Sequence, residues 1–427
     1  MKVYNNPAKE TWKQLAQRPQ LELGFLESSV RNILNRVKKS GDQAIRELTL
    51  QFDKVNIQNL EVTREEIYEA RKNLTPLLQD AIRTAAENIR KFHLAQKRDT
   101  VVVETMPGVK CWRKAVPITK VGIYIPGGTA PLFSTVLMLG IPATLAGCTE
   151  IILCTPPGKD GKIHPAILFA AELVGVTKIF KAGGAQAIAA MTYGTETIPN
   201  VYKIFGPGNQ YVTKAKQLIT EEGVAIDMPA GPSEVLVLAD ESCNPAFVAA
   251  DLLSQAEHGE DSQVMLVLLN GSKLDLIRKE ISSQLADLPR RAIAEKSLAN
   301  SRVVVFDSEA IAIDFTNEYA PEHLIINTSG AEALAEKIIN AGSVFIGNFS
   351  PEAVGDYASG TNHTLPTNGY AKAYAGVSLE SFLKYITYQQ LSEIGIRNVG
   401  PVVELMAEAE ALTAHRRAVS IRLQNLS

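Results

Sequence analysis

Residues 121–128, with the sequence VGIYIPGG, open the part of the chain that decides the fold. This short, largely apolar run is followed by a helix-like stretch at 131–147, an apolar run at 150–158, a helix-like stretch at 164–175 and a third apolar run at 178–184. Strands that alternate with helices in this way form a parallel sheet with helices packed on its faces. The segment therefore predicts a Rossmann-like α/β domain.

The same alternation returns beyond residue 233. Strand-like runs occupy 234–240, 263–270, 302–306, 323–328 and 343–348, and helix-like stretches lie between them. We therefore predict a second parallel sheet and an α/β fold with two Rossmann-like domains. Residues 124–233 are expected to form a nucleotide-binding-like domain, and residues 21–123 together with 234–375 a larger, discontinuous α/β domain.

The two ends of the chain differ from these alternating segments. Residues 21–97 read as amphipathic helices, which predicts a helical N-terminal flank after a weakly patterned segment at 1–20. Residues 376–427 are predicted to form a helical C-terminal arm rather than a third core.

Composition limits the kind of partner. The chain has 427 residues, 46% of them hydrophobic, which is enough for two sizeable cores. Its formal charge of -3 provides no large basic field, so we expect a small-molecule ligand rather than nucleic acid or an anionic membrane. No apolar run reaches the roughly 18 residues of a membrane span, and the start has no apolar leader, which predicts a cytoplasmic protein. The scattered cysteines lack metal-site spacing, and we assign them no role.

Glycine-rich loops follow strands of the first alternating segment, at residues 126–128, 182–184 and 205–209. Ligands of open parallel sheets bind at the carboxyl ends of the strands, so a nucleotide could lie across these loops. The polar or aromatic side chains at their tips are Tyr124, Gln186 and Asn209. Each could contact a cofactor or merely hydrogen-bond its own loop.

Residues 206–211, with the sequence GPGNQY, come closest to a dinucleotide-binding fingerprint. The third glycine is missing, although Asp227 falls near the distance expected for a carboxylate that binds ribose. The alternative is a tight turn that needs glycine at positive φ. Both interpretations stay open at this point.

The segment 251–259, DLLSQAEHG, places polar side chains on an otherwise apolar helix. Asn244 is a suitable N-cap, Pro245 suits the first helical position, and Gly259 follows the predicted end. Gln255 and His258 are then one turn apart and could share a cation. Taken alone, such a pair more often closes hydrogen bonds at a helix end.

Acids and histidines recur at three further places. Glu322 and His323 lie at the start of the predicted strand 323–328, and His323 could act as a general base, although a surface salt contact is the commoner role of such a pair. Asp356, in the loop 355–363, is a suitable ligand for a divalent ion. Glu410 and His415 are five residues apart and would share a site only if the helix breaks between them.

Ten strings now identify a family resemblance, in order over nearly the whole chain: VGIYIPGG, APLFSTVLMLG, GGAQAIAA, KIFGPGN, AIDMPAGPSEVLV, DLLSQAEHG, PEHLI, SPE, GDYASGTNH and LTAH. Together they resemble histidinol dehydrogenase. The collinear set is far more specific than any one of its members, and no functional position departs from the family pattern.

The resemblance implies a zinc ion in each subunit, for which manganese could substitute. Its ligands would be Gln255, His258, Asp356 and His415. L-Histidinol would be held by these ligands together with Ser233, His323 and Glu410. His323 would be the general base, and Glu322 would activate water. Tyr124, Gln186 and Asn209 would contact NAD.

The implied reaction is the four-electron oxidation of L-histidinol to L-histidine through L-histidinal with two NAD, the final step of histidine biosynthesis. In the family, Glu410 and His415 come from the partner subunit, so the resemblance implies a homodimer that exchanges its arms. An arm that folds back on its own chain is the alternative.

Other classes of function fit the residues less well. A zinc hydrolase would favour a ligand set such as H-E-x-x-H, which is absent, and would not need nucleotide-type loops. A metal-binding protein without activity would not need the intact acid and histidine pair. A family member acting on another amino alcohol is the remaining alternative.

Overall fold

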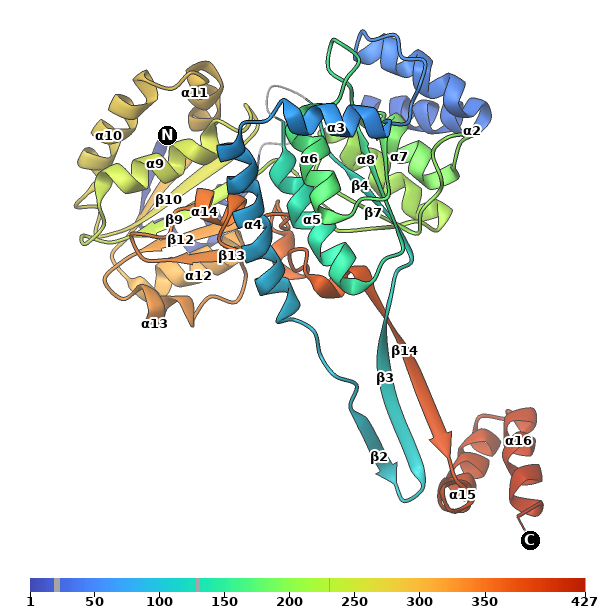
Figure 1. The fold of residues 1–427 in the computed structure, drawn as a ribbon. Coiled ribbons are helices and arrows are strands. Elements are labelled where there is room, and N and C mark those ends of the chain that lie inside the picture. The colour runs from blue at the N-terminus through green and yellow to red at the C-terminus, as the bar shows by residue number, and fades with distance from the viewer. Residues whose placement is uncertain (19–23, 128–130, 230, 427) are drawn as a thin grey trace.

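Two helix-covered sheets lie side by side, and an arm extends from between them (Figure 1). The computed structural model describes residues 1–18, 24–127, 131–229 and 231–426. Gly128 of the first predicted glycine loop and residues 19–23 of the predicted N-terminal segment and flank lie outside the described residues.

The first alternating segment forms a five-stranded sheet in which all strands are parallel. The strand order is β6 (Lys178–Lys181), β5 (Glu150–Thr155), β4 (Lys120–Tyr124), β7 (Lys203–Phe205) and β8 (Ala225–Ile226). Its connecting helices are α5 (Phe133–Ala146), α6 (Pro165–Val174), α7 (Gly184–Tyr193) and α8 (Gln210–Ile219). The predicted Rossmann-like sheet is therefore confirmed.

The N-terminal flank is helical, as predicted, and consists of α2 (Gly24–Phe52), α3 (Arg64–Lys72) and α4 (Pro76–Leu94). Helix α2 buries Val30, Ile45 and Leu48 in one core with Phe180 and Ile188 of the five-stranded sheet and its helix α7. Helices α3 and α4 pack on α5 and α6. The packing thus differs from the predicted grouping of residues 21–123 with the larger domain, because the apolar faces of these helices cover the other sheet.

The second alternating segment forms a six-stranded parallel sheet. Its order is β1 (Lys2–Asn5), β11 (Arg302–Phe306), β10 (Gln263–Leu269), β9 (Glu234–Ala239), β12 (His323–Asn327) and β13 (Ser343–Ile346). One face is covered by α9 (Pro245–Ala256), α10 (Leu274–Ala286) and α11 (Arg291–Ala299), and the other by α1 (Trp12–Leu15), α12 (Glu309–Tyr319) and α13 (Ala331–Ala335). The predicted second sheet is confirmed, with β1 as an added edge strand from the N-terminus.

The two sheets share one topology. Counting strands along the chain within each alternating segment, both have the spatial order 3-2-1-4-5, and β1 lies outside the third strand of the larger sheet. In parallel sheets with this order, ligands bind in a crevice at the carboxyl ends of the strands, beside the first strand, where the strand order reverses. Each sheet therefore offers the same potential ligand position.

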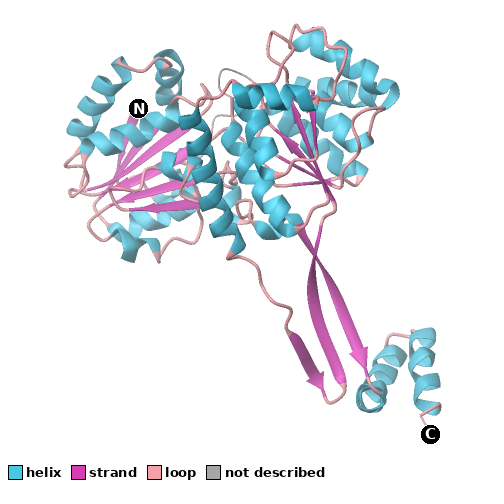
Figure 2. Cartoon of the chain, in the orientation of Figure 1, coloured by secondary structure: helices cyan, strands magenta, loops and turns pink. Residues whose placement is uncertain are grey.

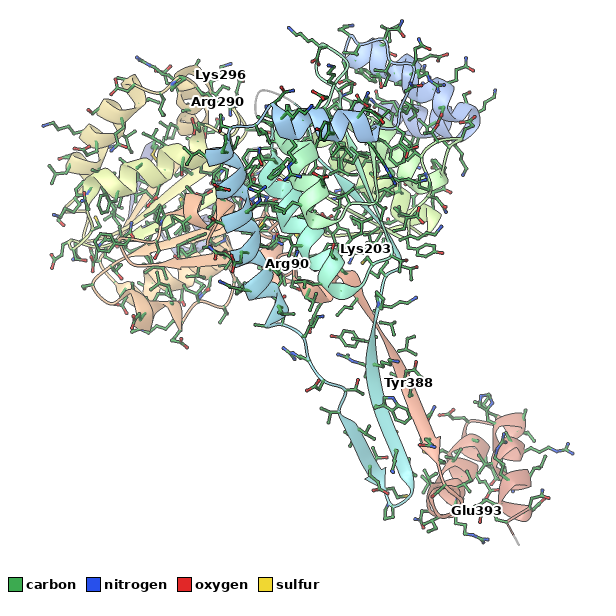
Figure 3. The ribbon with its side chains drawn as sticks, in the orientation of Figure 1. Arg90, Lys203, Arg290, Lys296, Tyr388 and Glu393 are labelled. Atoms are coloured by element: carbon green, nitrogen blue, oxygen red, sulfur yellow. The ribbon has the colours of Figure 1, made fainter. Side chains whose placement is uncertain are left out.

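The arm consists of an antiparallel sheet and two helices. Strand β14 (Leu383–Leu391) pairs with β3 (Val109–Pro117) along its whole length, and β3 pairs with β2 (Val102–Met106). Helices α15 (Glu393–Ala409) and α16 (Thr413–Gln424) follow. Figure 2 shows these strands reaching away from both sheets, and Figure 3 places Tyr388 of β14 and Glu393 of α15 along the arm. The arm is thus only partly helical, because residues 383–391 pair with a strand far away in the sequence.

The remaining helices of the described chain are short. They are α14 (Glu352–Tyr357) and the 3-10 helices η1 (Lys9–Thr11), η2 (Thr220–Glu222), η3 (Tyr370–Lys372) and η4 (Leu379–Phe382). Among the described residues, no helix combines the length and the apolar character needed to cross a membrane.

Candidate functional site

A buried cluster of one histidine and three carboxylates lies at the amino end of β12. His323 is the first residue of the strand, and its Nδ1 is 3.4 Å from Glu352 Oε1 and 3.7 Å from Glu322 Oε2. Its Nε2 is 3.5 Å from Asp356 Oδ1. Because Glu352 and Asp356 are four residues apart on α14, they present their carboxylates on one face of that helix. The predicted pair of Glu322 and His323 is therefore buried rather than a surface salt contact.

Burial and mutual charge set the protonation of this cluster. Burial raises the pKa of Glu322 to about 8, because a carboxylate loses its hydration there. Burial by itself lowers the pKa of His323, but the neighbouring carboxylates, Glu352 foremost, raise it well above its ordinary value. Several acids thus surround one imidazole in a region of low dielectric. Such a cluster attracts a cation.

His258 lies just beyond α9 and close enough to the cluster for the charges of Asp356 and His323 to act on its imidazole, and Gln255 precedes it on that helix. Asn244 caps this helix, with its Oδ1 accepting the Ala246 N–H at 3.0 Å, and Pro245 is the first helical residue, as predicted. The helix ends at Ala256, slightly earlier than predicted, but the His258 N–H donates to the Gln255 carbonyl at 3.2 Å and extends the turn. The two side chains therefore still follow one another on a single turn.

The Gln255 amide is the clearest sign of a ligand. Its side chain is 0% exposed, and neither its oxygen nor its nitrogen has a hydrogen-bond partner within the described residues. An unsatisfied buried polar group costs on the order of 1–3 kcal/mol, so folded proteins rarely retain one without a use.

Burial lowers the pKa of His258, which keeps the imidazole neutral as metal binding requires, and the charge of Asp356 opposes this most strongly. His258 and Asp356 thus offer a neutral imidazole and a carboxylate near one another, and Gln255 offers an amide from α9, against which α14 packs. These donors suit a divalent ion such as zinc.

Glu352 belongs to the same region but was not assigned a role from the sequence. One ligand atom from each of His323, Glu352 and Asp356 lies within 4.8 Å of the others. Both Glu352 oxygens are buried without a hydrogen-bond partner within the described residues. The signal available in the sequence was its position in the string SPE, one helical turn before Asp356.

An ion pair behind the cluster orients Glu322. Arg18 Nε and Nη2 lie 2.6 and 2.7 Å from the two carboxylate oxygens of Glu234, which is 0% exposed. Glu234 in turn accepts the Glu322 N–H at 3.3 Å, and its own N–H donates to Glu322 Oε2 at 2.9 Å. Ser233 lies next to Glu234 at the amino end of β9, beside β12. Sequence reasoning missed Arg18 and Glu234, because a pair separated by 216 residues leaves no local pattern.

The structure does not bring Glu410 and His415 to this cluster within one chain. Both are exposed and lie at the far end of the arm, away from the six-stranded sheet (Figure 1). The helix break needed between them is present, since α15 ends at Ala409 and α16 begins at Thr413. Leu412 is the N-cap, so Thr413 begins the new helix without capping it.

A second site lies at the carboxyl ends of the five-stranded sheet. It is a cavity of about 1360 Å³, and its lining includes all three predicted nucleotide contacts, Tyr124, Gln186 and Asn209. The Tyr124 hydroxyl accepts the Gly184 N–H at 2.9 Å, and Asn209 Oδ1 caps α8 by accepting the Tyr211 N–H at 3.0 Å. Asn209 therefore supports its own loop and Tyr124 supports the loop at 182–184, while both also line the cavity.

The fingerprint interpretation at residues 206–211 is wrong in one respect. Asp227 does not line the cavity, because its carboxylate accepts the Gly206 N–H at 2.9 Å and pairs with the buried Lys216. Gly206 has a φ of +125°, and a Cβ there would overlap the Tyr124 carbonyl oxygen. The glycine thus serves a tight turn, as the alternative interpretation holds.

Comparison with known proteins identifies the family of the chain. A family model described as histidinol dehydrogenase matches residues 16–423. The chain is 59% identical over 426 residues to histidinol dehydrogenase of Bacteroides thetaiotaomicron, covering 100% of both chains. It is 53% identical over 415 residues to the chloroplastic histidinol dehydrogenase of Arabidopsis thaliana, covering 96% of this chain and 89% of that one.

A solved structure agrees as closely. The crystal structure of histidinol dehydrogenase from Elizabethkingia anophelis has a TM-score of 0.98 and 56% identity to this chain, covering 100% of this chain and 98% of that one. The sequence resemblance is confirmed over the full length of the fold, and the chain belongs to the histidinol dehydrogenase family.

Proposed function

We propose that the protein oxidises L-histidinol to L-histidine through L-histidinal, with two NAD and one zinc ion per subunit, as the final step of histidine biosynthesis. The observation that carries the proposal is the buried cluster around His323 in a chain of this family, and the unsatisfied amide of Gln255 on α9 supports it. A cavity at the carboxyl ends of the other sheet supports it by offering room for the nucleotide.

The proposed zinc ligands are Gln255, His258 and Asp356, completed by His415 of the partner subunit. When bound, the ion would anchor the imidazole and amino nitrogens of the substrate and would offset the negative charge that raises the pKa of His323. Manganese is a plausible substitute, because oxygen and imidazole donors suit several divalent ions. Ser233 and the partner's Glu410 are proposed to hold the substrate.

Two residues of this chain are proposed to move the protons. His323 accepts the hydroxyl proton of L-histidinol while NAD takes the hydride from the same carbon, which gives the aldehyde. Glu322 then orients a water molecule that adds to the aldehyde, and His323 accepts a proton from the resulting hydrate as the second NAD takes the hydride. The hydrogen bond from the Glu234 N–H fixes the Glu322 carboxylate for this step. Holding the substrate in place through both steps also retains the reactive aldehyde.

The position of the arm supports a homodimer with shared active sites. Within the chain, α15 leaves Leu405 and Met406 exposed at 69% and 61%. Apolar side chains that the described part of the chain leaves uncovered suit contact with a second copy. An exchanged arm would cover them and would carry Glu410 and His415 to the cluster of the other subunit.

The test is the amount of NADH formed per mole of L-histidinol, run to completion with NAD in excess. We expect two equivalents, lost after chelation and restored by zinc. One equivalent would mean that the reaction stops at the aldehyde and would contradict the roles of Glu322 and His323. The absence of NADH from the zinc-restored protein would contradict the proposed function.

A further inference from the structure

One carboxylate that lines the cavity of the five-stranded sheet takes no part in the proposed reaction. Asp53 follows the last residue of α2 and lines the cavity together with Tyr124 and Gln186. Burial is the main reason that the pKa of Tyr124 is raised, and the charge of Asp53 adds to it. Asp53 is therefore a neighbour of the proposed NAD contacts.

One oxygen of the Asp53 carboxylate is not engaged by the described residues. Its Oδ2 is buried without a hydrogen-bond partner within the described residues. Burial is the only influence on its pKa, which burial raises, as expected for a carboxyl group that no donor or cation stabilises. A partly buried carboxylate in this condition lacks the donors that normally offset its desolvation.

The other carboxylates near the cavity are occupied or exposed. Asp227 is held by Gly206 and Lys216 and is not part of the cavity lining. Asp160 lines the cavity, but it is exposed, and its Oδ1 accepts the Lys162 N–H within its own loop at 3.1 Å. Among the described lining residues, Asp53 is thus the one carboxylate that has a buried oxygen without a hydrogen-bond partner.

The position of Asp53 indicates which part of a dinucleotide it would meet. The reacting end of the cofactor must approach His323, which lies in the six-stranded sheet. Helix α2 covers the five-stranded sheet on the side far from the six-stranded sheet (Figure 1). Asp53 directly follows this helix and lines the cavity, which favours contact with the adenosine end over contact with the reacting end.

We propose that Asp53 accepts a hydrogen bond from the 2′-hydroxyl of the adenosine ribose and thereby selects NAD over NADP. A carboxylate accepts only, so it matches the hydroxyl donors of an unmodified ribose. A 2′-phosphate has no matching donor and would bring negative charge against a carboxylate that is already desolvated. This inference rests on the proposed function, because it assumes a nicotinamide dinucleotide in the cavity.

The test compares kcat/KM for NAD and NADP in the zinc-loaded protein and in Asp53→Asn and Asp53→Ser variants. We expect the preference for NAD to fall by about 10- to 100-fold in both variants, because a hydrogen bond to a charged group is lost. The matched control, Asp160→Asn, removes a carboxylate from the same cavity and should keep the preference of the unaltered protein. An unchanged preference in both Asp53 variants would overturn the inference.

A binding measurement on the unaltered protein keeps the test independent of folding and turnover. Calorimetric titration with 5′-AMP and with adenosine 2′,5′-bisphosphate should show tighter binding of 5′-AMP. Equal or tighter binding of the bisphosphate would overturn the role of Asp53. Failure of the proposed function would look different, since histidinol would then yield no NADH with either cofactor.

Discussion

The two sheets have the same strand order, yet their candidate sites lie at opposite edges. In the five-stranded sheet, Tyr124 and Asn209 line a cavity at the carboxyl ends of the strands. In the six-stranded sheet, His323 and Ser233 lie at the amino ends, where His323 is the first residue of β12. A shared topology therefore offers equivalent positions without deciding which edge is used.

The local residues explain the difference. At the carboxyl edge of the five-stranded sheet, glycines such as Gly206 let the backbone form tight turns and leave room for a ligand. At the corresponding edge of the six-stranded sheet, Asp240 uses its carboxylate on the Ser242 and Ser329 N–H groups of its own loops. The charged cluster around His323 lies at the other edge, where the buried ion pair of Arg18 and Glu234 stands behind it. Side chains, not strand order, decide where the chemistry lies.

The largest expected effect separates the two edges. His323→Asn should lower kcat by about 10²- to 10⁴-fold, because the proposed proton acceptor is lost. The dissociation constant for NAD, measured by calorimetry, should stay near that of the unaltered protein. Loss of NAD binding in this variant would mean that the two edges do not work as separate sites.

The next largest effect is expected when the ion pair of Arg18 and Glu234, behind the amino-edge cluster, is broken. Arg18→Gln leaves Glu234 buried without its partner, and breaking a buried ion pair costs about 3–5 kcal/mol of unfolding free energy. Because Glu234 also holds Glu322, kcat should fall more than KM changes. Denaturant unfolding and steady-state kinetics check both effects.

Arg31→Gln is the matched control for Arg18→Gln. Arg31 pairs with Glu27 and Glu221 on the surface, so its loss should change stability little. Equal destabilisation by the two substitutions would contradict a special role for the buried pair.

A glycine substitution tests the carboxyl edge. Gly206→Ala forces a Cβ against the Tyr124 carbonyl at a φ of +125°, which should cost about 1–3 kcal/mol and weaken NAD binding. Gly223→Ala is the control, since Gly223 also has a positive φ, of +82°, but no atom lies within 4 Å of the added Cβ. If both substitutions left NAD binding intact, the tight turn would not shape the cavity.

The smallest expected effect is a gain in the free energy of unfolding, whereas the substitutions above cause losses. Gln255→Met removes a buried amide that has no partner within the described chain, so the metal-free protein should gain about 1 kcal/mol in unfolding free energy. The same variant should no longer be stabilised by added zinc. A variant that is less stable without metal, and still stabilised by zinc, would contradict the ligand role of Gln255.

The sequence predicts local features of this fold better than distant pairings. The strand and helix alternation and the cap at Asn244 depend on neighbouring residues, and the structure confirms both. Strand β14 depends on pairing with β3, more than 200 residues earlier. Because this pairing leaves no local pattern, the sequence did not separate residues 383–391 from the predicted helical arm. The packing of α2 on the five-stranded sheet likewise depends on contacts between residues far apart in the sequence.

The candidate sites divide in the same way. Glycine loops and the spacing of Gln255 and His258 could be read as possible ligand positions, and the family resemblance gave them roles. Glu352, Glu234 and Arg18 carry no local motif, because their importance comes from burial and from partners elsewhere in the chain.

The central claim is that the amino-edge site is completed by the arm of a second subunit. Co-expression of His323→Asn and His415→Ala chains with different tags allows the heterodimer to be purified, with each homodimer as an inactive control. If the arm is exchanged, one site of the heterodimer holds both substitutions and the other holds neither, so its rate of L-histidinol oxidation should be about half that of the unaltered dimer. An inactive heterodimer would show that His323 and His415 act within one chain, which would contradict the account.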